Sequence, residues 1–310
     1  MPQQHPTRFA YLGPEGTFTE AALRSLGASS EGERRPAASV PAALAALRAG
    51  EVDAAFVPME NSVEGSVSPT LDGLAAGDPV VITGEVFLAV DFVLAVRPGV
   101  GLDGVGSVAS HPHALAQTRG WVAEHLPAAD VLAAASTADA ARLVAEGAFD
   151  AAVCPALAAE RYGLDAVATG LADHPGAVTR FVQVELPGRL PAPTGADKTT
   201  VHCVVTDRTG ALLDLLTEFA VRGISLTRLE SRPTRERLGV YSFSLDVEGH
   251  VADARMGDAL AALHRRCEEV RFLGSYPRDD GQAPKPVLDA DGDPAFGAAA
   301  DWLADLRRGH

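Results

Sequence analysis

Short apolar runs alternate with longer amphipathic stretches through residues 8–190 of the chain. The short runs have the length of strands, and the longer stretches repeat apolar residues at the spacing of one helix face. The predicted strands are 8–13, 53–60, 105–110, 131–136, 150–155 and 180–186, and the predicted helices are 17–27, 40–50, 113–126 and 137–147. This alternation is typical of an α/β fold with a mostly parallel sheet.

Two segments of this region match each other without a gap. They are "SVPAALAALRAGEVDAAFVP" and "STADAARLVAEGAFDAAVCP", and their identities other than alanine are Ser39/Ser136, Gly50/Gly147, Asp53/Asp150 and Pro58/Pro155. Each segment predicts a helix, a glycine turn, a strand and a proline, so we predict two similar lobes with a cleft between them. We expect the chain to cross between the lobes at 80–96 and to return at 173–184.

A Pro/Gly-rich linker, "PGRLPAPTGAD", separates these lobes from a compact C-terminal pattern. The predicted order is βαββαβ, with strands at 199–207, 224–233, 239–250 and 270–277 and helices at 211–223 and 252–268. This is the order of a ferredoxin-like domain of the α+β class.

The predicted domains follow from these patterns. They are a two-lobed α/β domain at 7–187 with its second lobe at about 84–171, a ferredoxin-like domain at 198–277, and a flexible tail at 278–310 with a short helix at "DWLADLRR".

Composition excludes several classes of protein. A net charge of -15 argues against nucleic acid or an anionic membrane as partner. The apolar stretch 86–96 contains Asp91 and falls far short of the roughly 20 residues that span a bilayer. The first residues do not resemble a signal peptide, so we expect a cytoplasmic protein. Cys154, Cys203 and Cys267 are widely spaced in apolar segments, which favours buried reduced thiols.

Familiar catalytic motifs do not explain the chain. "GVGLDG" fits the G-x-G-x-x-G pattern of dinucleotide-binding proteins, but that motif must be followed by a helix. Here a predicted strand follows, so we do not predict a dinucleotide site. The sequence contains no HExxH, paired CxxC, G-x-S-x-G or Walker motif, and we predict no metal site.

Small polar clusters follow the predicted strands, where open α/β sheets place their ligands. In "GPEGTFTEAA", Thr17 is positioned to cap a helix with Glu20 three residues later. Such a helix start suits an anion, but an ordinary capped helix is an equally good reading.

The stretch "VPMENSVEGSV" ends the second predicted strand. We expect Glu60, Asn61 and Ser62 to face the cleft, opposite Thr179. Glu64 lies in a glycine turn near solvent, so it does not form an acid/base pair with Glu60.

Further clusters follow in the second lobe and at its end. They comprise Ser110, His111, His113 and Gln117, then Ser136 and Thr137, then Thr179 and Arg180. For the histidines, local hydrogen bonding competes with catalysis, and for Arg180 a surface ion pair competes with a bidentate carboxylate contact. Together the clusters suit a small anionic substrate.

The ordered motifs resemble the prephenate dehydratase family. "YLGPEGTFTEAA", "VPMENSVEGSV", "SHPHALAQ", "ASTADAA", "YGL" and "TRF" carry that resemblance, and "TGALLDLLTEFAVRGISLTRLESRP" with "YSFSLDVEGH" resembles its ACT regulatory domain. The resemblance implies a two-lobed fold like that of periplasmic binding proteins. It also implies conversion of prephenate to phenylpyruvate in phenylalanine biosynthesis, without a metal or cofactor.

The resemblance also implies roles for single residues. Thr179 would hydrogen-bond the leaving hydroxyl of prephenate, Arg180 would contact a carboxylate, and Phe181 would pack. The remaining residues that match the cleft motifs are Thr17, Glu60, Asn61, Ser62, Ser110, Gln117, Ser136 and Thr137.

For the ACT domain, the resemblance implies feedback inhibition by L-phenylalanine, bound at an interface between paired domains of a homodimer or homotetramer. The residues that match this site are Gly210, Ala211, Leu212, Glu230, Ser231, Arg232 and Pro233.

Three positions depart from the family pattern. His113 stands where glutamine is usual, Ala177 where asparagine is usual, and Thr209 where proline is usual. Arogenate dehydratase is an alternative, because the motifs do not separate the two substrates, and the Ala177 departure leaves a non-catalytic amino-acid sensor of the same fold as a second alternative.

Overall fold

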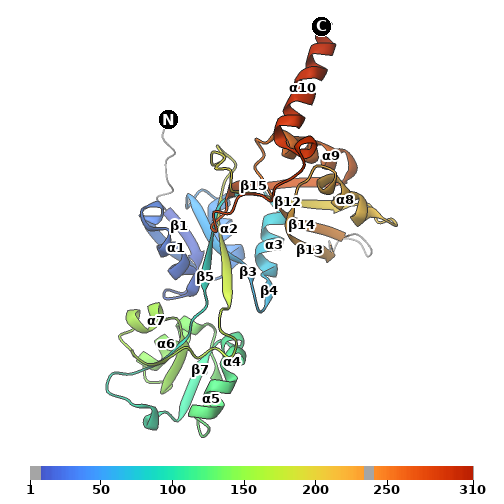
Figure 1. Ribbon diagram of the computed structural model, residues 1–310. Coiled ribbons are helices and arrows are strands. Elements are labelled where there is room, and N and C mark those ends of the chain that lie inside the picture. The colour runs from blue at the N-terminus through green and yellow to red at the C-terminus, as the bar shows by residue number, and fades with distance from the viewer. Residues whose placement is uncertain (1–7, 234–240, 310) are drawn as a thin grey trace. The chain divides into compact units, whose positions relative to one another are not determined.

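The structure, a computed structural model, describes residues 8–233 and 241–309 (Figure 1). The described chain divides into two compact units. The first takes the residues up to Gly73 together with Val86–Val182, and the second takes Leu74–Glu85 and the residues from Gln183 onward.

This division differs from the predicted boundaries, which run without interruption along the chain. The segment Leu74–Glu85 belongs to the second unit, although its sequence position is inside the predicted two-lobed domain at 7–187. Thr7, the predicted start of that domain, and Gly239 and Val240, the predicted start of a strand, lie outside the described residues.

The first lobe is built on a sheet in the order β2–β1–β3–β11–β5, with β4 paired to β3. Its elements are β1 (Arg8–Leu12), α1 (Phe18–Ser25), a 3₁₀ turn (Gly27–Ser30), β2 (Glu33–Ala37), α2 (Val40–Arg48), β3 (Ala54–Asn61), β4 (Gly65–Ser66), α3 (Ser68–Ala75), β5 (Val81–Ala89) and β11 (Val178–Glu185). β1 runs parallel to β2 and β3. The first half of β3 is fully buried, as expected for a central strand covered on both faces.

The second lobe has a sheet in the order β10–β6–β9–β7–β8. Its elements are β6 (Val93–Val96), a 3₁₀ turn (Leu102–Gly104), β7 (Ser107–Ser110), α4 (Pro112–Gln117), α5 (Arg119–His125), β8 (Asp130–Ala133), α6 (Thr137–Ala145), β9 (Ala151–Cys154), α7 (Ala156–Arg161) and β10 (Asp165–Thr169). Alanines of α6, α7 and β9 form much of one core cluster, and their small size lets the helices approach the sheet closely. Cys154 is a free thiol in this core, and burial raises its pKa to about 12.

The predicted repeat is confirmed. Ser39 caps α2 by accepting a backbone N–H at 3.3 Å, and Ser136 caps α6 in the same way at 2.9 Å. Gly50 and Gly147 end these helices at φ of 70° and 83°, a conformation that favours glycine. The strands that follow run parallel to a neighbouring strand of their own lobe, β3 to β1 and β9 to β7.

The two predicted crossings between the lobes are also confirmed. β5 leads into β6, and β10 leads back into β11. The two crossing segments lie side by side and are joined by a hydrogen bond from the Val90 N–H to the Ala177 carbonyl at 2.8 Å.

The predicted helix at 113–126 is wrong, since the structure has two helices, α4 and α5, that meet at Thr118. The Asp173 carboxylate accepts from the N–H groups of Gly120 and Trp121 at 3.0–3.3 Å and so satisfies the start of α5. The start of α5 is therefore stabilised by a distant part of the chain, which local periodicity does not reveal.

The second unit contains the predicted βαββαβ domain. Its elements are β12 (Asp197–Val205), α8 (Ala211–Ala220), β13 (Leu226–Pro233), β14 (Tyr241–Glu248), α9 (Ala254–Arg266) and β15 (Glu269–Pro277). The sheet order is β13–β14–β12–β15, and all its pairings are antiparallel. Leu215 and Phe219 of α8 and Met256 and Leu263 of α9 pack against the sheet to form its core.

The segment Leu74–Glu85 contacts this domain closely. Lys198 Nζ lies 2.8 and 2.9 Å from the two carboxylate oxygens of Glu85, and both side chains are at most 7% exposed. Gly274 has φ of 130°, and a Cβ there would lie 2.2 Å from the Ile82 carbonyl oxygen. A buried ion pair and a backbone approach that only glycine permits therefore hold the segment to the domain.

The tail contains more structure than its composition predicts. The expected short helix is α10 (Asp293–Arg308), preceded by a 3₁₀ turn (Asp289–Asp291), and it extends away from α9 (Figure 1). Pro294 lies in its first turn, Gly309 ends it at φ of 84°, and alanines favour its interior. None of the helices in residues 8–233 and 241–309 has the length and apolar character needed to cross a membrane.

We predict that Lys198→Met lowers the free energy of unfolding by about 3–5 kcal/mol, because it leaves the buried Glu85 carboxylate without its ammonium partner. Urea unfolding followed by circular dichroism measures this change. Arg142→Met is the matched control, since Arg142 forms surface pairs within α6 and its loss should cost about 1 kcal/mol or less. Equal losses in the two variants would contradict the account.

Candidate active site

A cavity of about 840 Å³ lies between the two lobes of the first unit. This volume is within the range of small-molecule sites in proteins. The predicted site residues that line it are Thr17, Asn61, Gln117, Ser136, Thr137, Thr179 and Phe181. Both lobes and both crossing segments therefore contribute to one site.

Thr179 and Asn61 are joined by a hydrogen bond between the neighbouring strands β11 and β3 of one sheet, rather than facing each other across the cleft as we expect from the sequence. The Asn61 Nδ2 donates to Thr179 Oγ1 at 2.8 Å, and the Asn61 Oδ1 accepts the N–H groups of Val63 and Glu64. These backbone contacts fix the amide orientation. Because the Thr179 oxygen accepts from Asn61, its own O–H is available to donate toward the cavity.

The start of α1 forms one wall of the cavity. Thr17 accepts the Glu20 N–H at 3.4 Å and donates to the Leu12 carbonyl at 3.0 Å. In a capping box the Glu20 carboxylate would accept the Thr17 N–H. Here it accepts the Gly16 N–H instead, at 2.6 Å. The predicted capping box is thus present with its second bond shifted by one residue.

The start of α6 contributes a similar wall from the second lobe. Ser136 caps the helix, Thr137 is its first residue, and both line the cavity. Asp139 lines it too, a residue that the sequence reading missed although it lies two positions after Thr137.

Aromatic side chains supply the apolar part of the cavity. Phe18 and Phe92 meet edge to face with ring centroids 5.5 Å apart, and both line the cavity. Phe181 stacks on the buried Phe56 at 6.0 Å, which fits the packing role expected for it. The cavity therefore combines aromatic walls with hydroxyl and amide groups.

Glu64 is placed differently from our expectation. It lines the cavity, and its carboxylate lies 3.4 Å from Gln117 Nε2 and 3.9 Å from His113 Nδ1 on α4 of the opposite lobe. The glycine turn points this side chain across the cleft rather than into solvent alone.

The two histidines have both a local role and a place in the cavity. His111 Nδ1 accepts the His113 N–H at 3.3 Å and caps α4, and the two rings meet edge to face. Burial, reinforced by the neighbouring His113, lowers the pKa of His111, while Glu64 opposes the shift.

Four predicted site residues do not line the cavity. The Arg180 side chain is 2% exposed and lies 3.8 Å from Glu60. Side chains alternate between the two faces of a strand, so these neighbours of Thr179 on β11 and of Asn61 on β3 point away from the cavity. Ser62 accepts the Val178 N–H and joins β3 to β11. Ser110 is fully buried and donates to the Val153 carbonyl. This placement gives all four a supporting position behind the wall.

The described lining residues include neither lysine nor arginine. Negative charge on a ligand must therefore be met by the helix starts at Thr17 and Ser136, by hydroxyl groups and by histidine. Among the residues that the structure describes, there is also no cluster of His, Cys, Asp and Glu side chains that could hold a metal ion.

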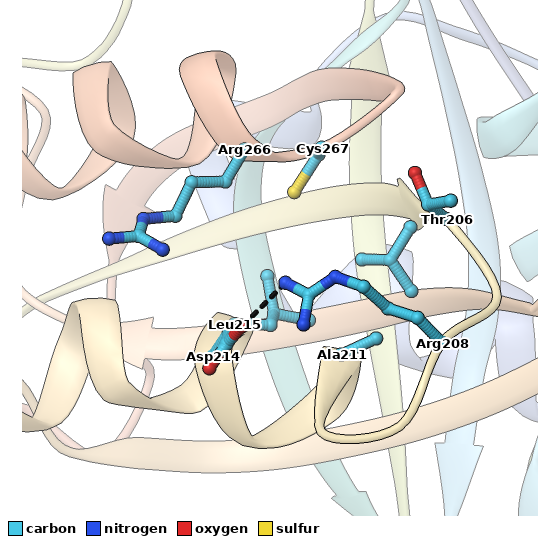
Figure 2. Close-up of a pocket in the computed structure, with 8 residues that line it drawn as sticks. Thr206, Arg208, Ala211, Asp214, Leu215, Arg266 and Cys267 are labelled. Carbon is cyan, nitrogen blue, oxygen red and sulfur yellow. Dashed lines mark hydrogen bonds and ion pairs between the residues drawn. The ribbon is translucent and has the colours of Figure 1, made fainter.

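The second unit contains a smaller pocket of about 20 Å³ at the start of α8. Ala211 and Leu215 line it, together with Arg266 and Cys267 from the end of α9. Arg208 and Asp214 also line the pocket and pair at 2.5 Å (Figure 2). Gly210 opens α8 at φ of 82°, and Leu212 is 37% exposed. The residues Glu230, Ser231, Arg232 and Pro233 lie on the edge strand β13 and are not among those that line the pocket.

These features define a class: a two-lobed α/β protein with a small-ligand cavity, extended by a ferredoxin-like domain. Comparison with known proteins supplies the family. The family model "Prephenate dehydratase" matches residues 9–188, and the model "ACT domain" matches residues 199–265. The chain belongs to the prephenate dehydratase family of hydro-lyases and carries an ACT domain.

Individual relatives agree with this placement. A prephenate dehydratase from Amycolatopsis methanolica is 51% identical, covering 98% of this chain and 99% of the relative. A crystal structure of prephenate dehydratase in complex with L-Phe from Arthrobacter aurescens is 48% identical with a TM-score of 0.89, covering 97% of this chain and 100% of that one. The structure of GqqA, described as a novel type of quorum quenching acylase, is 32% identical with a TM-score of 0.79, covering 87% and 97%. The predicted α/β fold class with its ACT domain is confirmed.

We predict that acid destabilises the chain partly through His111. Its pKa is lower in the folded state, so the unfolded chain binds a proton first as the pH falls through about 6.5, and stability decreases there. His111→Asn keeps a capping side chain but does not titrate. Melting temperatures at about pH 8 and about pH 5.5 should therefore differ less in His111→Asn than in the unmodified chain. An equal difference in the two proteins would contradict the prediction.

Proposed function

We propose that the chain converts prephenate to phenylpyruvate, carbon dioxide and water in phenylalanine biosynthesis. Family membership supports the reaction class. The observation that carries the proposal is the Thr179 hydroxyl, which lines the cavity with its oxygen held by the Asn61 amide.

The chemistry needs positioning more than it needs a strong acid. The ring carboxylate leaves as carbon dioxide, its bonding electrons enter the ring, and the ring hydroxyl departs with a proton as water. The product ring is aromatic, so the reaction has a large driving force. A donor on the leaving oxygen stabilises the charge that develops there. Thr179 supplies this hydrogen bond, and solvent supplies the proton.

The helix starts that line the cavity support binding of the two carboxylates of prephenate. The start of α1 offers backbone N–H groups at Thr17, and the start of α6 offers them at Ser136 and Thr137. Arg180 is buried beside Glu60 behind this wall, which supports an indirect role through β11 rather than the direct carboxylate contact implied by the resemblance.

A direct assay tests this proposal. Purified chain is given prephenate or arogenate, and phenylpyruvate and phenylalanine are measured separately. Turnover of prephenate supports the proposal, whereas turnover of arogenate alone identifies an arogenate dehydratase. Phenylalanine binding without turnover of either substrate identifies a sensor.

We predict that Thr179→Val lowers kcat by roughly a hundredfold or more, because the variant keeps the shape but loses the donor to the leaving oxygen. Steady-state formation of phenylpyruvate measures the loss. Thr179→Ser is the matched control, since it keeps the hydroxyl and should retain most of the activity. Near-normal turnover by Thr179→Val would remove this residue from the mechanism.

We further propose that L-phenylalanine inhibits the enzyme through the ACT domain. The similar Arthrobacter aurescens structure contains L-Phe, which supports phenylalanine as the ligand. The pocket at Ala211 has a volume of about 20 Å³, close to that of one water molecule, so one chain cannot enclose phenylalanine there. The exposed edge strand β13 carries Glu230–Pro233, and a second chain in a homodimer or homotetramer would bring that strand to the pocket.

We predict that Glu230→Gln raises the phenylalanine concentration for half-inhibition by roughly tenfold while kcat stays within about twofold. The substitution weakens phenylalanine binding at the proposed ACT-domain site, but the cavity is unchanged. Inhibition curves at fixed prephenate measure the effect. Glu269→Gln, on the opposite edge strand β15, serves as control and should leave inhibition unchanged. Unaltered inhibition in Glu230→Gln would count against this site.

A further inference from the structure

A group of charged side chains behind the cavity joins the two lobes. Arg161, the last residue of α7 in the second lobe, lies 2.8 Å from the Glu20 carboxylate of α1 in the first lobe. It also pairs with Glu15 in the turn before α1. We call this group, Arg161 with Glu15 and Glu20, the cross-lobe ion pair.

Glu20 is well prepared to receive this cation. Its side chain is 2% exposed and accepts the Gly16 N–H at 2.6 Å and a guanidinium N–H of Arg24 at 2.6 Å. Burial acts to raise the pKa of Glu20, but these donors and Arg161 outweigh it and hold the pKa below its usual value. Arg161 therefore faces a carboxylate that stays ionised at neutral pH.

The backbone of the second lobe approaches the same turn. Gly16 has φ of 87°, and a Cβ there would lie 3.0 Å from Ala158 Cα on α7. The Tyr162 hydroxyl also lies 3.4 Å from the Glu15 carbonyl oxygen. The cross-lobe ion pair thus acts where the two lobes are already in contact.

The turn that it holds is part of the cavity wall. Gly13, Pro14 and Thr17 line the cavity, whereas Arg161 and Glu20 are not among the lining residues. Arg161 therefore reaches a bound substrate only through the position of this turn and of the α1 start.

We propose that Arg161 is a positioning residue for substrate binding: its pairing with Glu15 and Glu20 keeps the α1 start against the second lobe, so that the anion-binding cavity is assembled before substrate arrives. This inference rests on the proposed function.

A defined kinetic consequence follows. If only a fraction of the molecules has an assembled cavity, the apparent affinity falls by that fraction, whereas a saturating substrate restores the assembled form. Loss of the cross-lobe ion pair should therefore raise KM and leave kcat nearly unchanged. A change that merely reduced the amount of folded enzyme would lower the apparent kcat and leave KM as it was.

Steady-state kinetics with prephenate test this inference in Arg161→Gln, Glu15→Gln and the double variant. We expect KM to rise roughly tenfold in Arg161→Gln, to rise less in Glu15→Gln, and to be no higher in the double variant than in Arg161→Gln, because the two residues share one interaction. Arg161→Lys keeps the charge and should recover part of the affinity. Arg8→Gln is the control, since Arg8 pairs with Asp53 inside the first lobe and should not affect KM.

Each other outcome is decisive. An unchanged KM in Arg161→Gln, a loss confined to kcat, or additive effects in the double variant would overturn the positioning role. If Arg161→Gln does not fold, Glu15→Gln serves as the test, because the Glu15 side chain is 51% exposed. A raised KM in Glu15→Gln then supports the positioning role, and an unchanged KM overturns it. The unmodified chain is measured in the same assay, and its failure to consume prephenate would instead overturn the proposed function.

Discussion

The structure depends on the way the chain crosses between its two lobes. β5 leads out of the first lobe, β11 returns to it, and the crossing segments are hydrogen-bonded to each other through Val90 and Ala177. Ser62 joins the end of β3 to the same place by bonding to the backbone of Val178. Val90 and Phe92 on one crossing segment and Thr179 and Phe181 on the other line the cavity, so part of its wall is made by the segments that connect the lobes.

This constraint explains the chemistry of the site. Thr179 lies at the start of the returning strand, and Asn61 at the end of the neighbouring strand holds its oxygen. Helix starts from both lobes face the same space, and they carry N–H groups rather than mobile cations. We propose that such a site orients an anionic substrate and hydrogen-bonds a leaving oxygen, which suits a reaction whose driving force is the formation of an aromatic ring.

Much of this arrangement is predictable from the sequence, because it depends on local signals. The serine caps, the positive-φ glycines and the buried strands repeat in both lobes, and the capped helix starts follow them directly. The strand β2 was missed because its residues, ERRPA, lack apolar alternation. The break between α4 and α5 depends on Asp173, and the cavity position of Glu64 depends on the facing lobe. These features arise from tertiary contacts that local periodicity does not encode.

The central claim is that prephenate reacts in the cavity between the lobes, with its leaving hydroxyl at Thr179. A crystal structure of Thr179→Val soaked with prephenate tests it most directly, because the weakened enzyme should retain the unreacted substrate. The account predicts density for prephenate inside the cavity of about 840 Å³, with the ring hydroxyl against residue 179 and the carboxylates at the starts of α1 and α6. Prephenate bound outside this cavity, or with its hydroxyl turned away from residue 179, would contradict it.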